Sequence, residues 1–183
     1  MDAMESQNIL KIAVIGAEST GKTALCESLA LHFNTTWVPE FARTYFNNSD
    51  IYNYSLRDLE IIALKQLEDE RRALAQAQSL LFCDTALITL RIWAELEFGT
   101  CPEIILRAMK HTRYHLYLVT SNEVPWEADD QRQNKFSREL ILQRNLDMIQ
   151  AEETPYQMVR GLGTERISSA IVSINAFLNT VKG

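Results

Sequence analysis

One eight-residue segment constrains the fold of this chain more than any other feature. It matches the phosphate-binding pattern Gly-x-x-x-x-Gly-Lys-Ser/Thr and reads Gly16-Ala17-Glu18-Ser19-Thr20-Gly21-Lys22-Thr23. In this pattern the backbone N–H groups surround phosphate, the lysine reaches the outer phosphates, and the Thr23 hydroxyl ligates Mg²⁺. An apolar run over residues 9–15 precedes the segment like a buried strand, and residues 23–31 follow it like a helix. The segment therefore predicts a nucleoside-triphosphate site at a strand-to-helix turn, where the helix dipole also favours phosphate.

Length, charge and cysteine spacing narrow the class of protein. The 183 residues fit a single domain over residues 1–183, and the net charge of -6 argues against nucleic acid as a partner. No apolar stretch reaches the roughly 18 residues of a membrane span, and the acidic N-terminus does not resemble a signal peptide. Cys26, Cys83 and Cys101 are widely spaced, as in a protein with reduced thiols. We therefore expect a cytoplasmic protein without a membrane or nucleic-acid partner, and its oligomeric state is left open.

Apolar runs alternate with helical patterns along the chain. Besides residues 9–15, strands are predicted at 35–38, 80–83, 115–119 and 156–159. Helices are predicted at 56–78, with a capping pair of Ser55 and Asp58, and at 86–98 and 165–181. The charged run 68–72 of the first helix, which includes Glu70, is predicted to be part of a solvated outer face. This alternation predicts an α/β fold of three layers, with a five-stranded parallel sheet covered on both faces.

Polar residues follow the second and third predicted strands, and ligands gather at the carboxyl ends of such strands. Asp84 stands where phosphate-loop proteins keep a carboxylate for Mg²⁺, although it also fits the N-cap of the next helix. Glu40 fits a base for an acceptor hydroxyl, and Arg43 fits a residue that holds the substrate or neutralises developing charge. A surface ion pair is the alternative for Glu40 and Arg43. Tyr45 follows in the same segment, and we include it among the substrate residues.

Two further regions are candidates for the site. The charged segment 124–138 is predicted to be a short lid, in which Arg132 and Arg138 stabilise the transferred phosphoryl group. An ordinary solvated loop is the alternative. The turn 161–164 fits either an adenine contact or a plain strand-to-helix turn. Trp93, like Tyr52 and Tyr54, fits a flat substrate ring as well as core packing.

The other motifs exclude most classes of phosphate-loop protein. The sequence Asn134-Lys135-Phe136-Ser137 lacks the final Asp of the guanine-reading pattern Asn-Lys-x-Asp. Asp84 does not begin Asp-x-x-Gly either, because Leu87 occupies the glycine position. A large ATPase motor needs a longer chain. A small-molecule kinase that uses ATP and Mg²⁺ fits the length and the predicted lid.

Several motifs also occur in the order of a known family. They are the phosphate loop, Pro39-Glu40-Phe41-Ala42-Arg43, Asp84-Thr85 with Trp93, Pro125-Trp126 with Asp129 and Arg132, and Pro155-Tyr156 through Gly161. Together they resemble the nicotinamide-riboside kinase domain of the NadR regulator proteins, a branch of the phosphate-loop nucleoside kinases. The resemblance covers nearly the whole chain. It implies ATP-dependent phosphorylation of the riboside 5′-hydroxyl to nicotinamide mononucleotide for NAD salvage, with Glu40 or Asp84 as the base.

Two departures from that family keep alternatives open. The family pattern after the third strand is Asp-Thr-Asp, whereas here Ala86 follows Asp84 and Thr85. The chain also lacks the His-x-Gly-His motif of the family's adenylyltransferase domain, so we expect it to make the mononucleotide without adenylylating it. The alternatives are a kinase for another nucleoside or nucleotide and an ATP-binding regulatory module without turnover.

Overall fold

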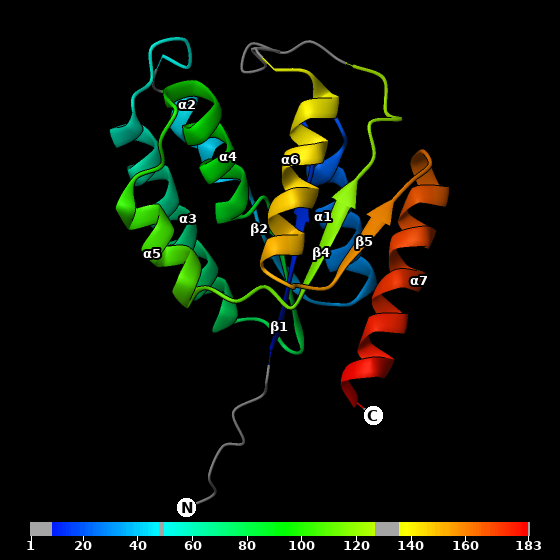
Figure 1. Cartoon of the computed structure of the whole chain (residues 1–183). Helices are drawn as coiled ribbons and strands as arrows, with labels where there is room; N and C mark the ends of the chain where they lie inside the picture. Colours follow the sequence, from blue (N-terminus) through cyan, green and yellow to red (C-terminus); the bar gives the residue numbers. More distant parts are fainter. Residues whose placement is uncertain (1–8, 48–49, 127–135, 183) are drawn as a thin grey trace, which may run out of the picture.

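Five parallel strands form the centre of the molecule in the computed structural model, which describes residues 9–47, 50–126 and 136–182 (Figure 1). Their order in the sheet is β2-β3-β1-β4-β5. The strands are β1 (Leu10–Ile15), β2 (Thr36–Val38), β3 (Leu80–Asp84), β4 (Leu116–Thr120) and β5 (Tyr156–Val159). Each lies within a residue of its predicted position. The predicted five-stranded parallel sheet is therefore confirmed.

Six helices of the described chain lie between strands, and a seventh follows β5. They are α1 (Lys22–His32), α2 (Phe41–Phe46), α3 (Leu56–Leu74), α4 (Leu87–Phe98), α5 (Glu103–His111), α6 (Arg138–Ala151) and α7 (Gly163–Lys182). The predicted end of α3 at residue 78 is wrong, because residues 75–78 turn the chain back towards β3. The predicted capping pair is confirmed, since the Ser55 N–H donates to the Asp58 carboxylate at 2.7 Å.

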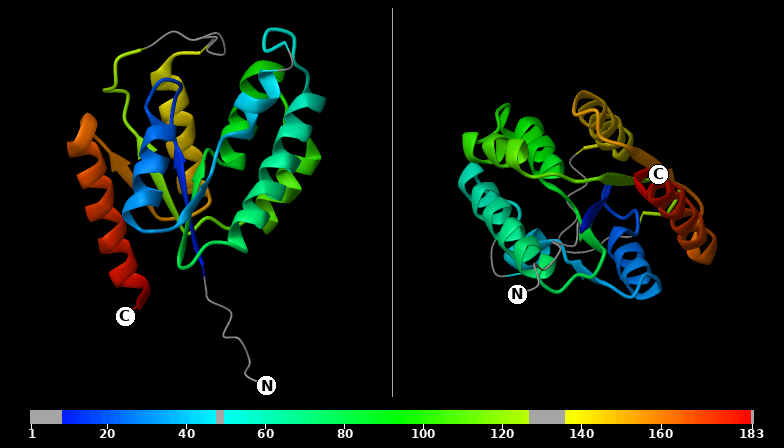
Figure 2. Two further views of the ribbon diagram at one scale, coloured as in Figure 1. Left: turned by 180° about the vertical axis from the view of Figure 1, so that it is seen from behind. Right: turned by 90° about the horizontal axis from the view of Figure 1, so that it is seen from below.

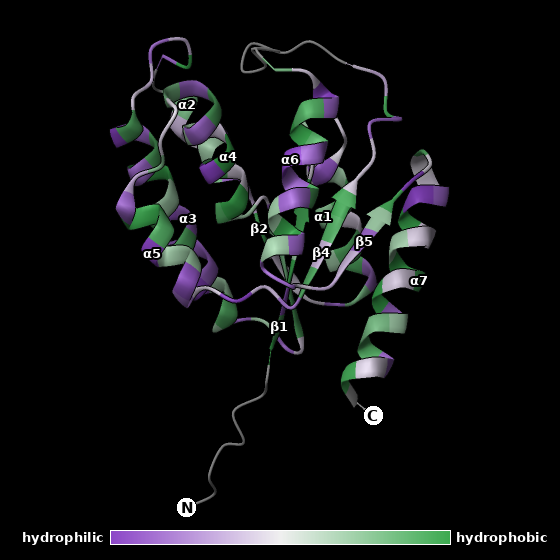
Figure 3. Ribbon diagram, viewed as in Figure 1, coloured by the Kyte–Doolittle hydropathy of each residue, from purple (hydrophilic) through white to green (hydrophobic). Residues whose placement is uncertain are grey.

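Helices cover both faces of the sheet, as alternation along β1 requires (Figure 2). Ile12 and Val14 point to one face, where they pack with α1 and α7. Ala13 and Ile15 point to the other, where α4 and α6 cover them. A third apolar cluster joins α2, α3, α4 and α5. Figure 3 shows the same division, with apolar strands at the centre and polar residues on outer helix faces.

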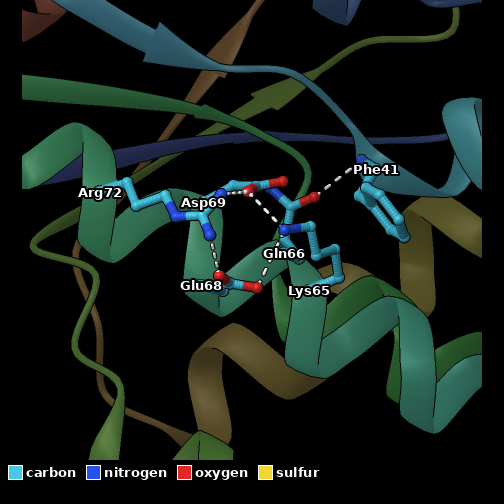
Figure 4. Close-up of polar contacts among 6 residues, drawn as sticks. All are labelled: Phe41, Lys65, Gln66, Glu68, Asp69 and Arg72. Carbon is cyan, nitrogen blue, oxygen red and sulfur yellow. Dashed lines mark hydrogen bonds and ion pairs between the residues drawn. The ribbon is translucent and has the colours of Figure 1, made fainter.

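Helix α3 supports the segment that follows β2. The side-chain oxygen of the buried Gln66 accepts the Phe41 N–H at 2.8 Å, which fixes the first residue of α2 directly after Glu40 (Figure 4). On the outer side of α3, Lys65 contacts Glu68 at 2.9 Å and Asp69 at 3.4 Å. These partly exposed pairs contribute little to stability. The inner contact of α3 with α2 is therefore the one that positions the residue after Glu40.

One residue predicted for the outer face of α3 lies inside. Glu70 is 1% exposed, and its carboxylate contacts the Lys11 ammonium at 2.5 Å and accepts from the Tyr114 hydroxyl at 2.8 Å. The prediction of a solvated Glu70 is wrong because Lys11, distant in sequence, enters the same side of the sheet. The pair lies at the N-terminal end of β1, away from the phosphate loop.

Some predictions fall partly outside the described residues. Residues 127–135 of the predicted lid at 124–138, including Arg132, are among those not described, so the lid stays a prediction. Among the described residues, no helix is both long and apolar enough to cross a bilayer. Cytoplasmic location stays a prediction. All three cysteines are free; Cys26 and Cys83 are buried, whereas Cys101 is only half-buried.

Candidate active site

The phosphate loop lies at the carboxyl end of β1 and passes very close to β4. Gly16 has a φ of +147°, and a Cβ built on it meets the Thr120 hydroxyl at 2.1 Å. Thr120 also donates to Ile15 O at 3.1 Å and shares a 2.7 Å hydrogen bond with Thr20. The missing side chain at Gly16 thus allows the loop to be tied to the neighbouring strand.

Gly16→Ala is expected to weaken ATP binding and to lower the free energy of unfolding by about 1–3 kcal/mol. The new Cβ forces Thr120 to move, and with it the hydrogen bond that holds Thr20. Urea unfolding and ATP titration measure the two effects. Gly99→Ala is the matched control, because Gly99 also has positive φ but has nothing within 4 Å of the added Cβ. Equal ATP affinities in Gly16→Ala and wild type would contradict this account of the loop.

Within the loop, one carbonyl oxygen gathers two side chains. Ala17 O accepts from the Lys22 ammonium at 2.9 Å and from the Thr20 hydroxyl at 2.8 Å. Gly21, with φ +72°, is the residue that leads into α1, so the loop amides and the helix N-terminus face the same space. Lys22 is therefore held over the loop, where its charge can meet phosphate oxygens.

Thr23 and Asp84, which the sequence predicts as ligands of Mg²⁺, are in direct contact. The Thr23 hydroxyl donates to Asp84 Oδ2 at 2.5 Å, which joins the start of α1 to the end of β3. Asp84 is 1% exposed, and its Oδ1 has no hydrogen-bond partner within the described part of the chain. A buried carboxylate oxygen without a partner, beside a threonine hydroxyl, fits the oxygen ligands that Mg²⁺ takes beside substrate phosphates. Asp84 does not cap α4, whose N-cap residue is Ala86.

The surroundings of Asp84 disfavour the ionised form of its carboxyl group. Burial raises its pKa from 3.8 to about 6, and the Glu40 carboxylate adds to this increase. Lys22, the Thr23 hydrogen bond and Arg43 act in the opposite direction on the same pKa. Two carboxylates and two cations thus influence each other at this edge of the sheet. Such strained charge is typical of sites that bind a cation or move a proton.

A cavity joins the phosphate loop to the segment after β2. Its walls include the loop residues Gly16, Ala17, Glu18 and Lys22 and the predicted acceptor residues Glu40, Arg43 and Trp93. Glu40 and Arg43 also form an ion pair with a 3.5 Å separation between Oε2 and Nε. Five aromatic side chains line the cavity, namely Phe46, Tyr54, Trp93, Trp126 and Phe136. The cavity therefore brings phosphate-loop residues together with three of the five residues predicted for the acceptor, whereas Asp84 and Tyr45 are not among its lining residues.

Other predicted residues lie in different places. Tyr45 is not among the residues that line the cavity, and its hydroxyl donates to Asp58 at 2.5 Å, so the structure does not bring it to the acceptor side. Tyr52 is 66% exposed and is also absent from the lining. Arg138 lines the cavity from the first residue of α6 and donates to Val124 O at 2.8 Å. The turn predicted at 161–164 is shorter, because α7 begins at Gly163.

Two residues of interest were not singled out from the sequence. Thr89 lines the cavity and is 4% exposed, yet its hydroxyl has no partner among the described residues. Arg166 is 5% exposed and lies in the first turns of α7. The sequence carried a signal for Arg166, since it shares the spacing of four with the buried Ala170 and Ile174 on one face of α7.

Comparison with known families agrees with this geometry. A family model described as an AAA domain (AAA_28) matches residues 11–166. The chain belongs to this family. The matched region includes the phosphate loop, the segment after β2 and Asp84. The region matched by the family model thus contains most of the residues that lie at the candidate site.

Individual relatives confirm the resemblance to NadR. The trifunctional NAD biosynthesis/regulator protein NadR of Salmonella typhimurium is 27% identical over 158 residues, which are 79% of this chain and 38% of NadR. A crystal structure of NadR in complex with NR superposes with a TM-score of 0.79 at 21% identity, covering 92% of this chain and 50% of that one. Another, of NadR with NAD and AMP-PNP, gives a TM-score of 0.72 at 23% identity over 92% and 49% of the two chains. This chain therefore spans about half or less of the NadR proteins it matches.

Proposed function

We propose that this protein is a kinase that transfers the γ-phosphoryl group of ATP to the 5′-hydroxyl of nicotinamide riboside. The observation that carries the proposal is the single cavity that joins the phosphate loop to Glu40, Arg43 and Trp93. Likeness to NadR structures that hold NR and AMP-PNP supports the choice of acceptor and donor. The product is nicotinamide mononucleotide, which places the protein in NAD biosynthesis.

The aromatic walls of the cavity suit the nicotinamide ring of this acceptor. The ring of nicotinamide riboside is a flat pyridinium cation, and aromatic faces attract such cations. Trp93 and Tyr54 contribute such rings from α4 and the segment before α3. The lining carries Glu18 and Glu40 but also Lys22, Arg43 and Arg138, so the attraction for a cationic planar ring comes from the aromatic faces.

Each polar residue of the site has a role in the proposed transfer. Lys22 and the loop amides hold the β- and γ-phosphates. Thr23 and Asp84 would hold Mg²⁺, which when bound neutralises phosphate charge. Glu40 is the better candidate for the base, because it lines the cavity whereas Asp84 is occupied by the Thr23 hydroxyl. Arg138 would neutralise charge on the transferred group.

Two further residues of the sequence prediction, Arg132 and Ala86, bear on this proposal. Arg132 lies outside the described residues, so its phosphoryl contact rests on the sequence alone. Ala86, where the NadR pattern has a second Asp, is fully buried in the apolar cluster under α4. We propose that the acceptor is held without a carboxylate at this position, by Glu40 and Arg43 from the other side of the cavity.

A substrate panel tests the proposal. Purified protein with Mg-ATP is given nicotinamide riboside, its reduced uncharged form, uridine, thymidine or deoxyadenosine, and phosphorylated product is measured by mass. We expect the highest kcat/KM for nicotinamide riboside. Product from another nucleoside alone would move the protein to a different acceptor within the kinase class. ATP binding without product from any acceptor would favour a regulatory module.

Trp93→Ala is expected to raise the KM for nicotinamide riboside by about 5- to 30-fold, since stacking and cation–π contact with a desolvated ring contribute roughly 1–2 kcal/mol. The KM for ATP should change little, because the residue lies on the acceptor side of the cavity. Steady-state kinetics with each substrate varied in turn measures both constants. Trp37→Phe, in the other apolar cluster, is the control for altered packing. An equal rise in both KM values would argue against a ring contact at Trp93.

A further inference from the structure

Arg166 is a buried cation without a described function. It is 5% exposed, and none of its three guanidinium nitrogens has a hydrogen-bond partner among the described residues. Leaving a buried charge without partners is costly, so such groups normally pair with another charge or bind a ligand. The residue therefore needs an explanation that the packing around it does not give.

The surroundings of Arg166 connect it to the nucleotide side of the site. Its charge interacts with Glu123, which follows β4, and with Arg138, which lines the active-site cavity. The Glu123 carboxylate is itself engaged, because it accepts the Gly161 N–H at 2.6 Å. Pro125, two residues after Glu123, contacts the phosphate loop, because its carbonyl oxygen accepts the Ser19 hydroxyl at 3.5 Å. Arg166 thus lies at the carboxyl ends of β4 and β5, near residues that contact the loop or line the cavity.

The order of the strands decides which substrate lies there. Glu40 and Asp84 follow β2 and β3, on one side of β1, whereas α7 begins after β5 on the other side (Figure 1). In phosphoryl transfer the attacking and leaving oxygens lie roughly in line through the transferred phosphorus. With the acceptor over β2 and β3, the rest of the donor must therefore extend from the phosphate loop over β4 and β5.

From this arrangement we propose that Arg166 binds the base of the donor nucleotide. The planar guanidinium suits a nucleobase, since it stacks on flat rings and donates paired hydrogen bonds to ring acceptors. This inference depends on the proposed function in one respect, which is that the acceptor binds over β2 and β3. It adds Arg166 to the phosphate loop as a second part of the donor site.

Nucleotide binding without any acceptor tests this assignment. ATP, ADP and inorganic tripolyphosphate are titrated calorimetrically into wild type, Arg166→Met and Arg166→Lys in the presence of Mg²⁺. We expect Arg166→Met to weaken ATP and ADP about 10- to 100-fold, the effect of losing charge-assisted contacts. Arg166→Lys should also lose affinity, because lysine lacks the planar fork. Tripolyphosphate, which has no nucleoside, should bind all three proteins nearly equally.

Measurements of unfolding distinguish nucleotide binding by Arg166 from a purely structural role. Arg166→Met removes a buried guanidinium that has no hydrogen-bond partner among the described residues, so the nucleotide-free variant should unfold at the same or a higher urea concentration than wild type. Arg160→Met is the matched control, since Arg160 is exposed one residue beyond β5 and should affect neither stability nor binding. ATP affinity unchanged in both Arg166 variants would overturn the assignment, as would an equal loss for ATP and tripolyphosphate. No acceptor is used, so failure of the riboside proposal leaves this test intact.

Discussion

Lys22→Ala is expected to lower kcat by about 10²- to 10³-fold, the usual effect of removing one preorganised positive group from developing charge. The folded protein should persist. The hydrogen bond that Lys22 donates goes to Ala17 O, which keeps the Thr20 hydroxyl as a second donor at 2.8 Å. Product formation under saturating Mg-ATP gives kcat, and urea unfolding checks the fold.

Lys65→Ala is the control for the loss of a lysine. Its ammonium contacts Glu68 and Asp69 on the outer side of α3, away from the cavity (Figure 4). Its rate should equal that of wild type, because exposed pairs of this kind contribute little. A wild-type rate in Lys22→Ala would mean that the phosphate loop does not hold the transferred group.

Asp84→Asn is expected to make the protein more stable and nearly inactive. Raising the pKa of Asp84 from 3.8 to about 6 costs the folded state roughly 3 kcal/mol at neutral pH, since one pKa unit corresponds to about 1.4 kcal/mol. Asparagine carries no charge and avoids that cost. It also removes the anionic ligand proposed for Mg²⁺, so kcat should fall by about 10²-fold or more.

The stability effect has a defined pH dependence. A carboxyl group whose folded pKa is raised binds its proton more tightly in the folded state, so its contribution to stability is present below pH 3.8 and lost as pH rises through about 6. In metal-free and nucleotide-free protein, the advantage of Asp84→Asn over wild type should therefore grow between about pH 4 and pH 6 and then stay constant.

Urea unfolding across this pH range measures the difference. Asp147→Asn, which removes an exposed carboxylate of α6, is the control and should follow wild type at every pH. A lower stability of Asp84→Asn at pH 7 would show that the Thr23 hydrogen bond outweighs the cost of burying the charge.

The sequence was informative wherever the signal is local. The phosphate loop, the five strands and the strand ends at Glu40 and Asp84 follow from apolar runs and the residues directly after them, and the structure places them as expected. Strand ends are predictable because parallel strands deliver their last residues to one edge of the sheet. That rule identified both carboxylates that now influence each other.

Residues governed by distant contacts could not be placed in this way. Tyr45 follows the same strand as Glu40 but turns to Asp58 of α3, a choice made by packing between two helices. Glu70 stands in a charged run yet is buried by Lys11 of β1. Helical spacing places Arg166 on the buried face of α7, but its nearness to Glu123 and Arg138 follows only from the pairing of β4 with β5. Such pairings join residues that no local pattern connects.

The most direct test of the central proposal follows the phosphoryl group itself. Protein in excess is mixed with ATP labelled at the γ-phosphate and nicotinamide riboside, and the label is traced in a single turnover, with Lys22→Ala in parallel. We predict that the label appears on nicotinamide mononucleotide in wild type only and that its transfer requires the riboside. Label released as inorganic phosphate regardless of the riboside, or retained in ATP, would contradict a kinase for this acceptor.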